Sequence, residues 1–166
     1  MTSKSPRKWV SDNLDSKSAT FCGAKWFNAT IWLGNGMTAS CHHPPPHKID
    51  PDEVKENFRA LHNSYYKKLV RKEMQEGKQT RECEYCWKIE NLNKDLVSDR
   101  YYKSACYNTA DLDTAFNTSW KADIIPKQLE IAFDNNCNFG CSYCNAGFAY
   151  NFFTTLTFVI CHFIEI

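Results

Sequence analysis

Apolar and polar residues alternate along the segment FNATIW (27–32), and a Gly-Asn-Gly turn (34–36) follows it. Alternation of this kind is typical of a half-buried strand, and the glycine-rich turn indicates a return strand. We therefore expect a short β-hairpin within residues 21–41. Cys22 and Cys41 stand at the two ends of that hairpin.

A second alternating segment occurs late in the chain, where Leu129, Ile131 and Phe133 are separated by single residues. This pattern predicts a strand within the sequence KQLEIAFDNNC (127–137). The strand would place Cys137 at its C-terminal end.

The clearest helix start lies at Asp50-Pro51, where Asp50 can cap, Pro51 suits the first helical turn and Glu53 completes a capping box. Apolar residues then follow at intervals of three and four, and Gly77 is a plausible stop. We expect one scaffold helix with an apolar stripe formed by Val54, Phe58, Leu61, Tyr65 and Leu69. Its basic residues, Lys67, Lys68, Arg71 and Lys72, are expected to face solvent.

Three segments deviate from these regular patterns. Residues 1–20 are polar, and we expect them to be disordered. The connector HHPPPHKI excludes a helix or a central strand, and its histidines, His42, His43 and His47, are either metal ligands or solvent-exposed linker residues.

The last segment (148–166) is aromatic and β-branched with one charge, which favours a buried strand or helix over a membrane span of about 20 apolar residues. A tail-anchored membrane protein is the alternative.

Composition narrows the class of protein. The 166 residues carry 20 basic and 19 acidic side chains, for a net charge of +1, and contain no long block of one sign. This balance gives no electrostatic reason to expect a nucleic acid or an anionic membrane as partner. Nine cysteines occur, and residues 1–18 lack the apolar core of a secretory signal. We therefore expect a reducing, cytoplasmic location and cysteines that bind metal, with Cys106 and Cys161 as bystanders.

Three cysteines, Cys137, Cys141 and Cys144, lie within the run CNFGCSYC. Three thiolates on a [4Fe–4S] cluster leave one iron without a protein ligand, so a substrate or cofactor can bind there. Gly140 allows a tight turn around a cluster, and the aromatic Tyr143 can shield it. A structural zinc loop, or reduced cysteines without metal, is the alternative.

CNFGCSYC resembles the signature of radical S-adenosylmethionine (radical SAM) enzymes. The resemblance implies that Cys137, Cys141 and Cys144 bind a [4Fe–4S] cluster and that Tyr143 lies beside its cofactor. It also implies that the preceding strand is the first of a partial (β/α)6 TIM-like barrel. In such enzymes the open iron binds S-adenosylmethionine, and an electron from a donor such as flavodoxin or ferredoxin releases a 5′-deoxyadenosyl radical.

Four more cysteines lie upstream, at Cys22, Cys41, Cys83 and Cys86. Four thiolates form a complete ligand set for a cluster or for zinc. The spacing Cys22-x13-Gly36-x4-Cys41 resembles the opening of SPASM and twitch domains, which carry auxiliary clusters beside radical SAM cores. The resemblance implies a second [4Fe–4S] cluster, although such modules usually follow the barrel rather than precede it. Structural zinc at the same four residues is the alternative.

The sequence therefore predicts an α+β chain with three parts. A disordered segment (1–20) precedes a twitch-like cysteine-rich domain of a hairpin and helices (21–121), and the first strand and cluster loop of an incomplete barrel follow (122–166). A weaker helical pattern covers 111–117. Because a closed barrel needs roughly 200 residues or more, we expect this chain to be a truncated, inactive form of an enzyme that modifies a peptide or small molecule. A zinc-binding interaction module without catalysis is the alternative.

Overall fold

A small mixed sheet forms the centre of the structure, a computed structural model that describes residues 5–93, 95–133, 136–137 and 150–151. Its strand order is β3-β2-β1-β4. The strands are β1 (Asn28–Trp32), β2 (Met37–Ala39), β3 (His47–Lys48) and β4 (Gln128–Ala132). β1 and β2 are antiparallel, and Gly36 in their turn has the positive φ of 67° that glycine tolerates. The predicted hairpin is confirmed.

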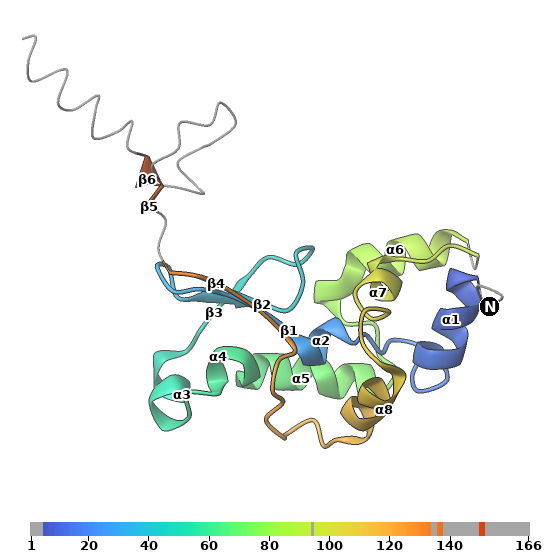
Figure 1. Cartoon of the computed structure of the whole chain (residues 1–166), viewed down its shortest axis with the longest axis horizontal. Coiled ribbons are helices and arrows are strands. Elements are labelled where there is room, and N and C mark those ends of the chain that lie inside the picture. Colours follow the sequence, from blue (N-terminus) through green and yellow to red (C-terminus); the bar gives the residue numbers. More distant parts are fainter. Residues whose placement is uncertain (1–4, 94, 134–135, 138–149, 152–166) are drawn as a thin grey trace, which may run out of the picture.

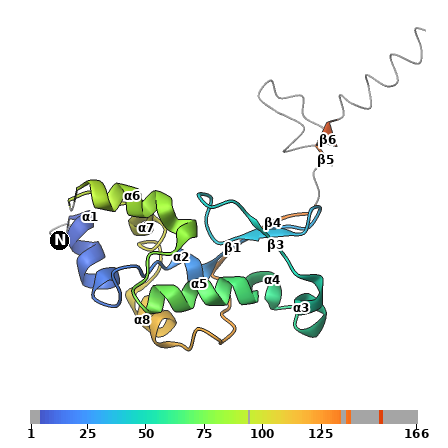
Figure 2. The ribbon, with the colours of Figure 1, turned by 180° about the vertical axis from the view of Figure 1, so that it is seen from behind.

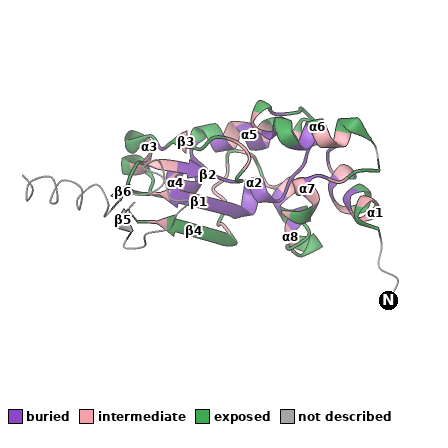
Figure 3. Cartoon of the chain, turned by 90° about the horizontal axis from the view of Figure 1, so that it is seen from above, coloured by how far each residue is buried: buried purple, intermediate pink, exposed green. Residues whose placement is uncertain are grey.

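β4 confirms the second predicted strand, and it pairs in parallel with β1 so that Ile131 lies opposite Ile31. It is an edge strand of the sheet, and its exposed face appears in green in Figure 3. Beyond it, β5 (Asn136–Cys137) and β6 (Tyr150–Asn151) form a separate parallel pair. The fold is thus α+β, and the predicted barrel stays a prediction.

The helical span after the sheet begins where expected, because the side chain of Asp50 accepts a hydrogen bond from the amide of Asp52. It ends near Gly77, whose φ is 75°. The prediction of one continuous helix is wrong. Three helices occupy the span, namely α3 (Pro51–Glu56), α4 (Ala60–Asn63) and α5 (Tyr65–Gln75).

Two residues with extended backbones cause these breaks. Asn57 has φ −150° and ψ 107°, and Ser64 has ψ 153°. The hydroxyl of Ser64 accepts from the amide of Lys67, so this residue caps α5 as a new helix. The break changes which side of the helix faces the core, and Phe58 and Tyr65 of the predicted apolar stripe are exposed.

The buried face of α5 contains Lys67, Val70, Arg71 and Met74. These residues recur at intervals of three and four, as one helix face requires. The prediction that Lys67 and Arg71 face solvent is therefore wrong: they are 4% and 0% exposed. Figures 1 and 2 show α5 running along the sheet and under α2 (Ala24–Phe27).

Residues 6–15 form helical structure, so the prediction of disorder is wrong for this part of the N-terminal segment. α1 (Pro6–Val10) is followed by a π-helical turn (Ser11–Asp15). Val10 and Leu14 are 1% and 0% exposed and join the core. Burial of these side chains anchors a segment that is otherwise polar.

Four further helical elements surround the same core: a 3-10 turn (Arg81–Cys83), α6 (Glu84–Leu92), α7 (Asp99–Tyr102) and α8 (Thr109–Asn117). α8 confirms the weaker helical pattern. The core contains Phe21, Trp26, Met74 and Leu112, all completely buried. Among the residues that the structure describes, no helix is long and apolar enough to cross a membrane. The segment 148–166 lies outside the described residues except for β6.

Candidate metal centre

The four upstream cysteines come from three separate parts of the fold. Cys22 precedes α2, Cys41 follows β2, and Cys83 and Cys86 lie at the start of α6. In Figures 1 and 2 the loop after β2 lies beside the start of α6. Cys22 interacts electrostatically with Cys83 and with Cys41. Cys86 interacts with the same two residues. These interactions place the four cysteines near one another, but among the described residues the group whose ligand atoms all lie within 4.8 Å of one another is Cys41, His42 and His43.

Burial favours the protonated form of two of these thiols, Cys22 and Cys86, in the absence of a metal ion. Cys22, Cys83 and Cys86 are 9%, 9% and 8% exposed. Desolvation, reinforced by Cys83 and Cys41, raises the pKa of Cys22 to about 12. Burial likewise raises the pKa of Cys86. A metal ion that bound here would have to displace protons, so its affinity would rise with pH.

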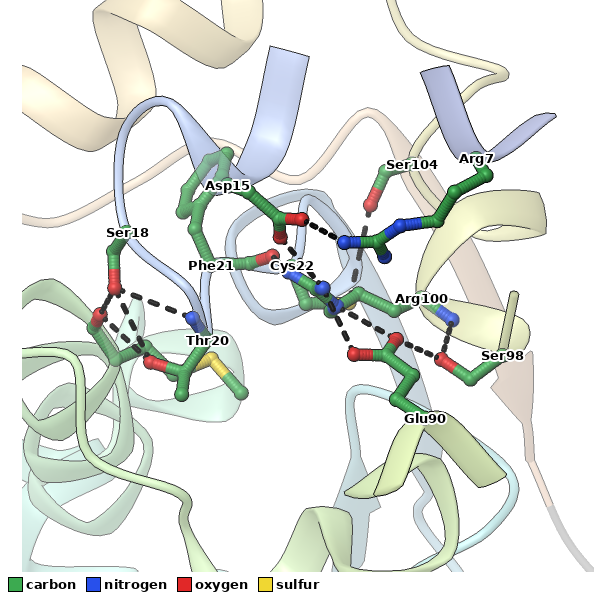
Figure 4. A network of polar contacts seen from close by, with 11 residues as sticks. Arg7, Asp15, Ser18, Thr20, Phe21, Cys22, Glu90, Ser98, Arg100 and Ser104 are labelled. Carbon is green, nitrogen blue, oxygen red and sulfur yellow. Dashed lines mark hydrogen bonds and ion pairs between the residues drawn. The ribbon is translucent and has the colours of Figure 1, made fainter. Parts of the chain in front are cut away.

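Hydrogen-bond donors lie next to two of the thiols. The hydroxyl of Ser104 lies 3.9 Å from the sulfur of Cys22 and also accepts from the amide of Gly23 at 2.9 Å (Figure 4). Burial dominates the raised pKa of Cys86, and hydrogen bonds from the Ser98 side chain and the Arg100 backbone offset part of that rise. Such donors stabilise thiolates and tune a bound metal or cluster.

Positive charge also approaches the cysteines. Lys25 is 4% exposed and forms an ion pair with Glu82. Its charge weakly opposes the rise that burial causes in the pKa of Cys22. Lys25 in turn repels Lys67. Burial, together with Arg71 and Lys25, lowers the pKa of Lys67 to about 7. This part of the core already contains buried cations, so it favours the binding of an anion over that of a further cation.

Two of the connector histidines lie beside Cys41. Ligand atoms of Cys41, His42 and His43 all lie within 4.8 Å of one another. The side chain of His43 is only 17% exposed, so the interpretation as a solvated linker is wrong for this residue. His47 lies apart, in contact with the hydroxyl of Ser64 at 3.2 Å.

The three-cysteine loop lies mostly outside the described residues. Only the backbone of Cys137 is placed, in β5. Cys141, Tyr143 and Cys144 lie outside the described residues, so their roles stay predictions. Cys106 is exposed and donates to the carbonyl of Lys103 at 3.6 Å, as expected of a cysteine outside the site.

Sequence reasoning missed the residues that contact the thiols, Ser98 and Ser104, and those that contact the neighbouring histidines, Tyr85 and Asp99. Ser104 reaches Cys22 across 82 positions of the sequence, and Asp99 reaches His43 across 56. No short motif encodes such distant pairs. The local signals were the Cys83-x2-Cys86 pair and the Cys22-x13-Gly36-x4-Cys41 spacing, and both mark the thiols alone.

Comparisons with protein-family models, curated proteins and solved structures give no match.

Proposed function

We propose that this chain is an iron–sulfur protein of the radical SAM type with two clusters. Cys22, Cys41, Cys83 and Cys86 would bind an auxiliary [4Fe–4S] cluster. The observation that supports this most is that four thiols from three separate parts of the chain, three of them buried, interact electrostatically with one another. Four thiolates with neighbouring hydrogen-bond donors suit a closed cluster.

The second cluster belongs to the loop CNFGCSYC, which resembles the radical SAM signature. Cys137, Cys141 and Cys144 would hold three irons and leave the fourth for the amino and carboxylate groups of S-adenosylmethionine. Tyr143 would cover the cofactor. The whole protein would then use one electron from a flavodoxin- or ferredoxin-like donor to generate a 5′-deoxyadenosyl radical for a peptide or small-molecule substrate in the cytoplasm.

Anaerobic reconstitution with iron and sulfide tests this proposal. We expect about eight irons per chain, because two four-iron clusters should form. Cys83→Ser and Cys141→Ser should each lower the content to about four irons. Cys106→Ser is the matched control and should keep the full content, since Cys106 is exposed and apart from the site. A chain that takes up zinc alone, without sulfur-to-iron charge-transfer absorption, would refute the proposal.

A structural zinc site is the second candidate function, because four thiols also supply the number of ligands that zinc takes. The chain would then be an interaction module, with the Pro-rich connector presenting a surface to its partner. Zinc would bind once per chain, and Cys83→Ser would unfold the domain, whereas Cys141→Ser would leave it folded. The two variants thus separate the zinc function from the cluster function.

A further inference from the structure

Two imidazoles and a carboxylate meet at the mouth of the thiol site. Nε2 of His43 lies 2.8 Å from Oδ2 of Asp99, and Nε2 of His42 lies 3.4 Å from the same oxygen. The two ring centroids are 4.0 Å apart. Three potential ligand atoms therefore surround one point at the surface of the molecule.

Rigid neighbours hold two of these side chains in place. The ring of His43 stacks on Tyr85 of α6, with centroids 3.7 Å apart and an interplanar angle of 18°. Asp99 is the first residue of α7, a helix that the hydroxyl of Ser98 caps. Prolines follow His43 directly and restrict the loop. Ligands fixed in this way lose little conformational freedom when an ion binds.

The chemistry of these atoms differs from that of the thiols. Imidazole nitrogen and carboxylate oxygen together suit Zn²⁺, Co²⁺, Ni²⁺ and Fe²⁺. The side chains of His42 and Asp99 are 58% and 29% exposed, so water can complete the coordination of an ion. The positive charge of Lys103 repels positive charge at His42, and it would therefore lower the affinity of this site for a metal ion.

We propose that His42, His43 and Asp99 bind one divalent transition-metal ion at a site separate from the four thiols. Cys41 lies within 4.8 Å of both imidazoles, and we leave its thiol to the four-cysteine set. The proposed ion would sit one residue away from that set along the chain. Its presence does not depend on whether the thiols hold a cluster or zinc.

Titration of the full chain with Co²⁺ tests this site, because the two kinds of ligand give different spectra. Thiolates produce intense charge-transfer absorption, whereas nitrogen and oxygen ligands produce weak ligand-field bands. With the metal-free chain, we expect two Co²⁺ ions per chain, one bound by the thiolates and one by the imidazoles and the carboxylate. His42→Ala and Asp99→Asn should each weaken the binding of the latter ion at least about tenfold and leave the thiolate absorption unchanged.

His47→Ala is the matched control, since His47 belongs to the same connector but contacts Ser64 instead of Asp99. It should bind Co²⁺ like the unaltered chain. Unchanged binding in both His42→Ala and Asp99→Asn would overturn the proposal, as would loss of the thiolate absorption in these variants. Circular dichroism of His42→Ala, whose side chain is largely exposed, shows that the fold is intact. Iron and sulfide content reports separately on the proposed clusters.

Discussion

Arg100 and Arg71 are both buried, with 2% and 0% exposure, yet their surroundings are opposite. The guanidinium of Arg100 lies between two carboxylates, 2.9 Å from Glu90 and 2.8 Å from Asp15 (Figure 4). The guanidinium of Arg71 donates to the carbonyl of Lys25 at 2.9 Å and to the side-chain oxygen of Asn63 at 2.8 Å. Among the described residues, no carboxylate lies within hydrogen-bonding distance of Arg71.

The difference appears in the pKa of each group. Burial opposes the charge of Arg100, but Glu90 and Asp15 outweigh it and raise the pKa. Burial lowers the pKa of Arg71 to about 10, against a weaker opposing effect of Asp123. The α1–α6–α7 side of the core thus balances its charge internally. The α5 side carries excess positive charge, and it adjoins Lys25 and the thiol of Cys22, where metal-bound thiolates would supply negative charge.

The largest effect is expected from Arg100→Met, which removes the centre of the balanced network. Glu90 would be left without its cation, with a side chain only 15% exposed, whereas Asp15 would keep Arg7 at 2.7 Å. We expect the free energy of unfolding to fall by about 3–5 kcal/mol, as measured for broken buried ion pairs. Urea unfolding followed by circular dichroism measures this loss.

Lys55→Met is the control for that experiment, because the Lys55–Asp52 pair is 75% and 82% exposed. Its removal should cost at most about 1 kcal/mol. Adding Glu90→Gln to Arg100→Met should recover part of the stability, since one uncompensated charge disappears. Glu90→Gln alone lowers the free energy of unfolding by some amount. If it lowered the free energy of Arg100→Met by the same amount, the pairing of the two residues would be contradicted.

Arg71→Met should have a smaller effect, because it leaves no carboxylate unpaired. The variant loses a donor to the buried carbonyl of Lys25, which costs about 1–3 kcal/mol. Asn63 keeps a partner through the amide of Ile124 at 2.9 Å. The same urea measurement applies. A loss as large as that of Arg100→Met would show that Arg71 has a charge partner that the geometry does not reveal.

Sequence patterns predicted the elements that depend on neighbouring residues. The hairpin, β4, α8, and both ends of the 51–77 helical span follow from alternation, caps and glycines. The four upstream cysteines were singled out by their types and spacing, and they interact electrostatically in the fold, but their role as one ligand set stays a prediction. Each of these features depends on residues that are close to one another in the sequence.

The same patterns failed for residues whose burial depends on partners that are distant in the sequence. Lys67 and Arg71 look like a solvated helix face in the sequence, but the break at Ser64 turns them inward. Arg71 then finds the carbonyl of Lys25, 46 positions away. Val10 and Leu14 are similarly isolated apolar residues in a polar segment, and only the assembled core shows what they contact. Burial of a charge cannot be deduced from a short window, because its partners come from elsewhere in the chain.

The smallest expected effect in this comparison is the contribution of Lys67 to the pH dependence of stability. Its amine donates to the hydroxyl of Thr38 at 2.7 Å, and its pKa falls from 10.5 to about 7 because of burial, Arg71 and Lys25. Between these two values the unfolded chain binds more protons than the folded one, so stability rises with pH. We expect the metal-free protein to gain about 1 kcal/mol from this group between pH 7 and pH 8. Above that range the thiols oppose the trend, because the raised pKa of Cys22 makes stability fall as unfolded thiols ionise.

Lys67→Met isolates this contribution when its unfolding is compared with that of the unaltered chain at each pH. The variant should lose the rise between pH 7 and pH 8. At pH 7 its free energy of unfolding should stay within about 1 kcal/mol of the original, because an unpaired buried charge is replaced by an apolar side chain of similar length. Thr38 keeps partners in the carbonyls of Thr30 and Leu61. An identical pH profile in the two proteins would show that Lys67 stays charged in the core, and the α5 side would then contain a compensating anion.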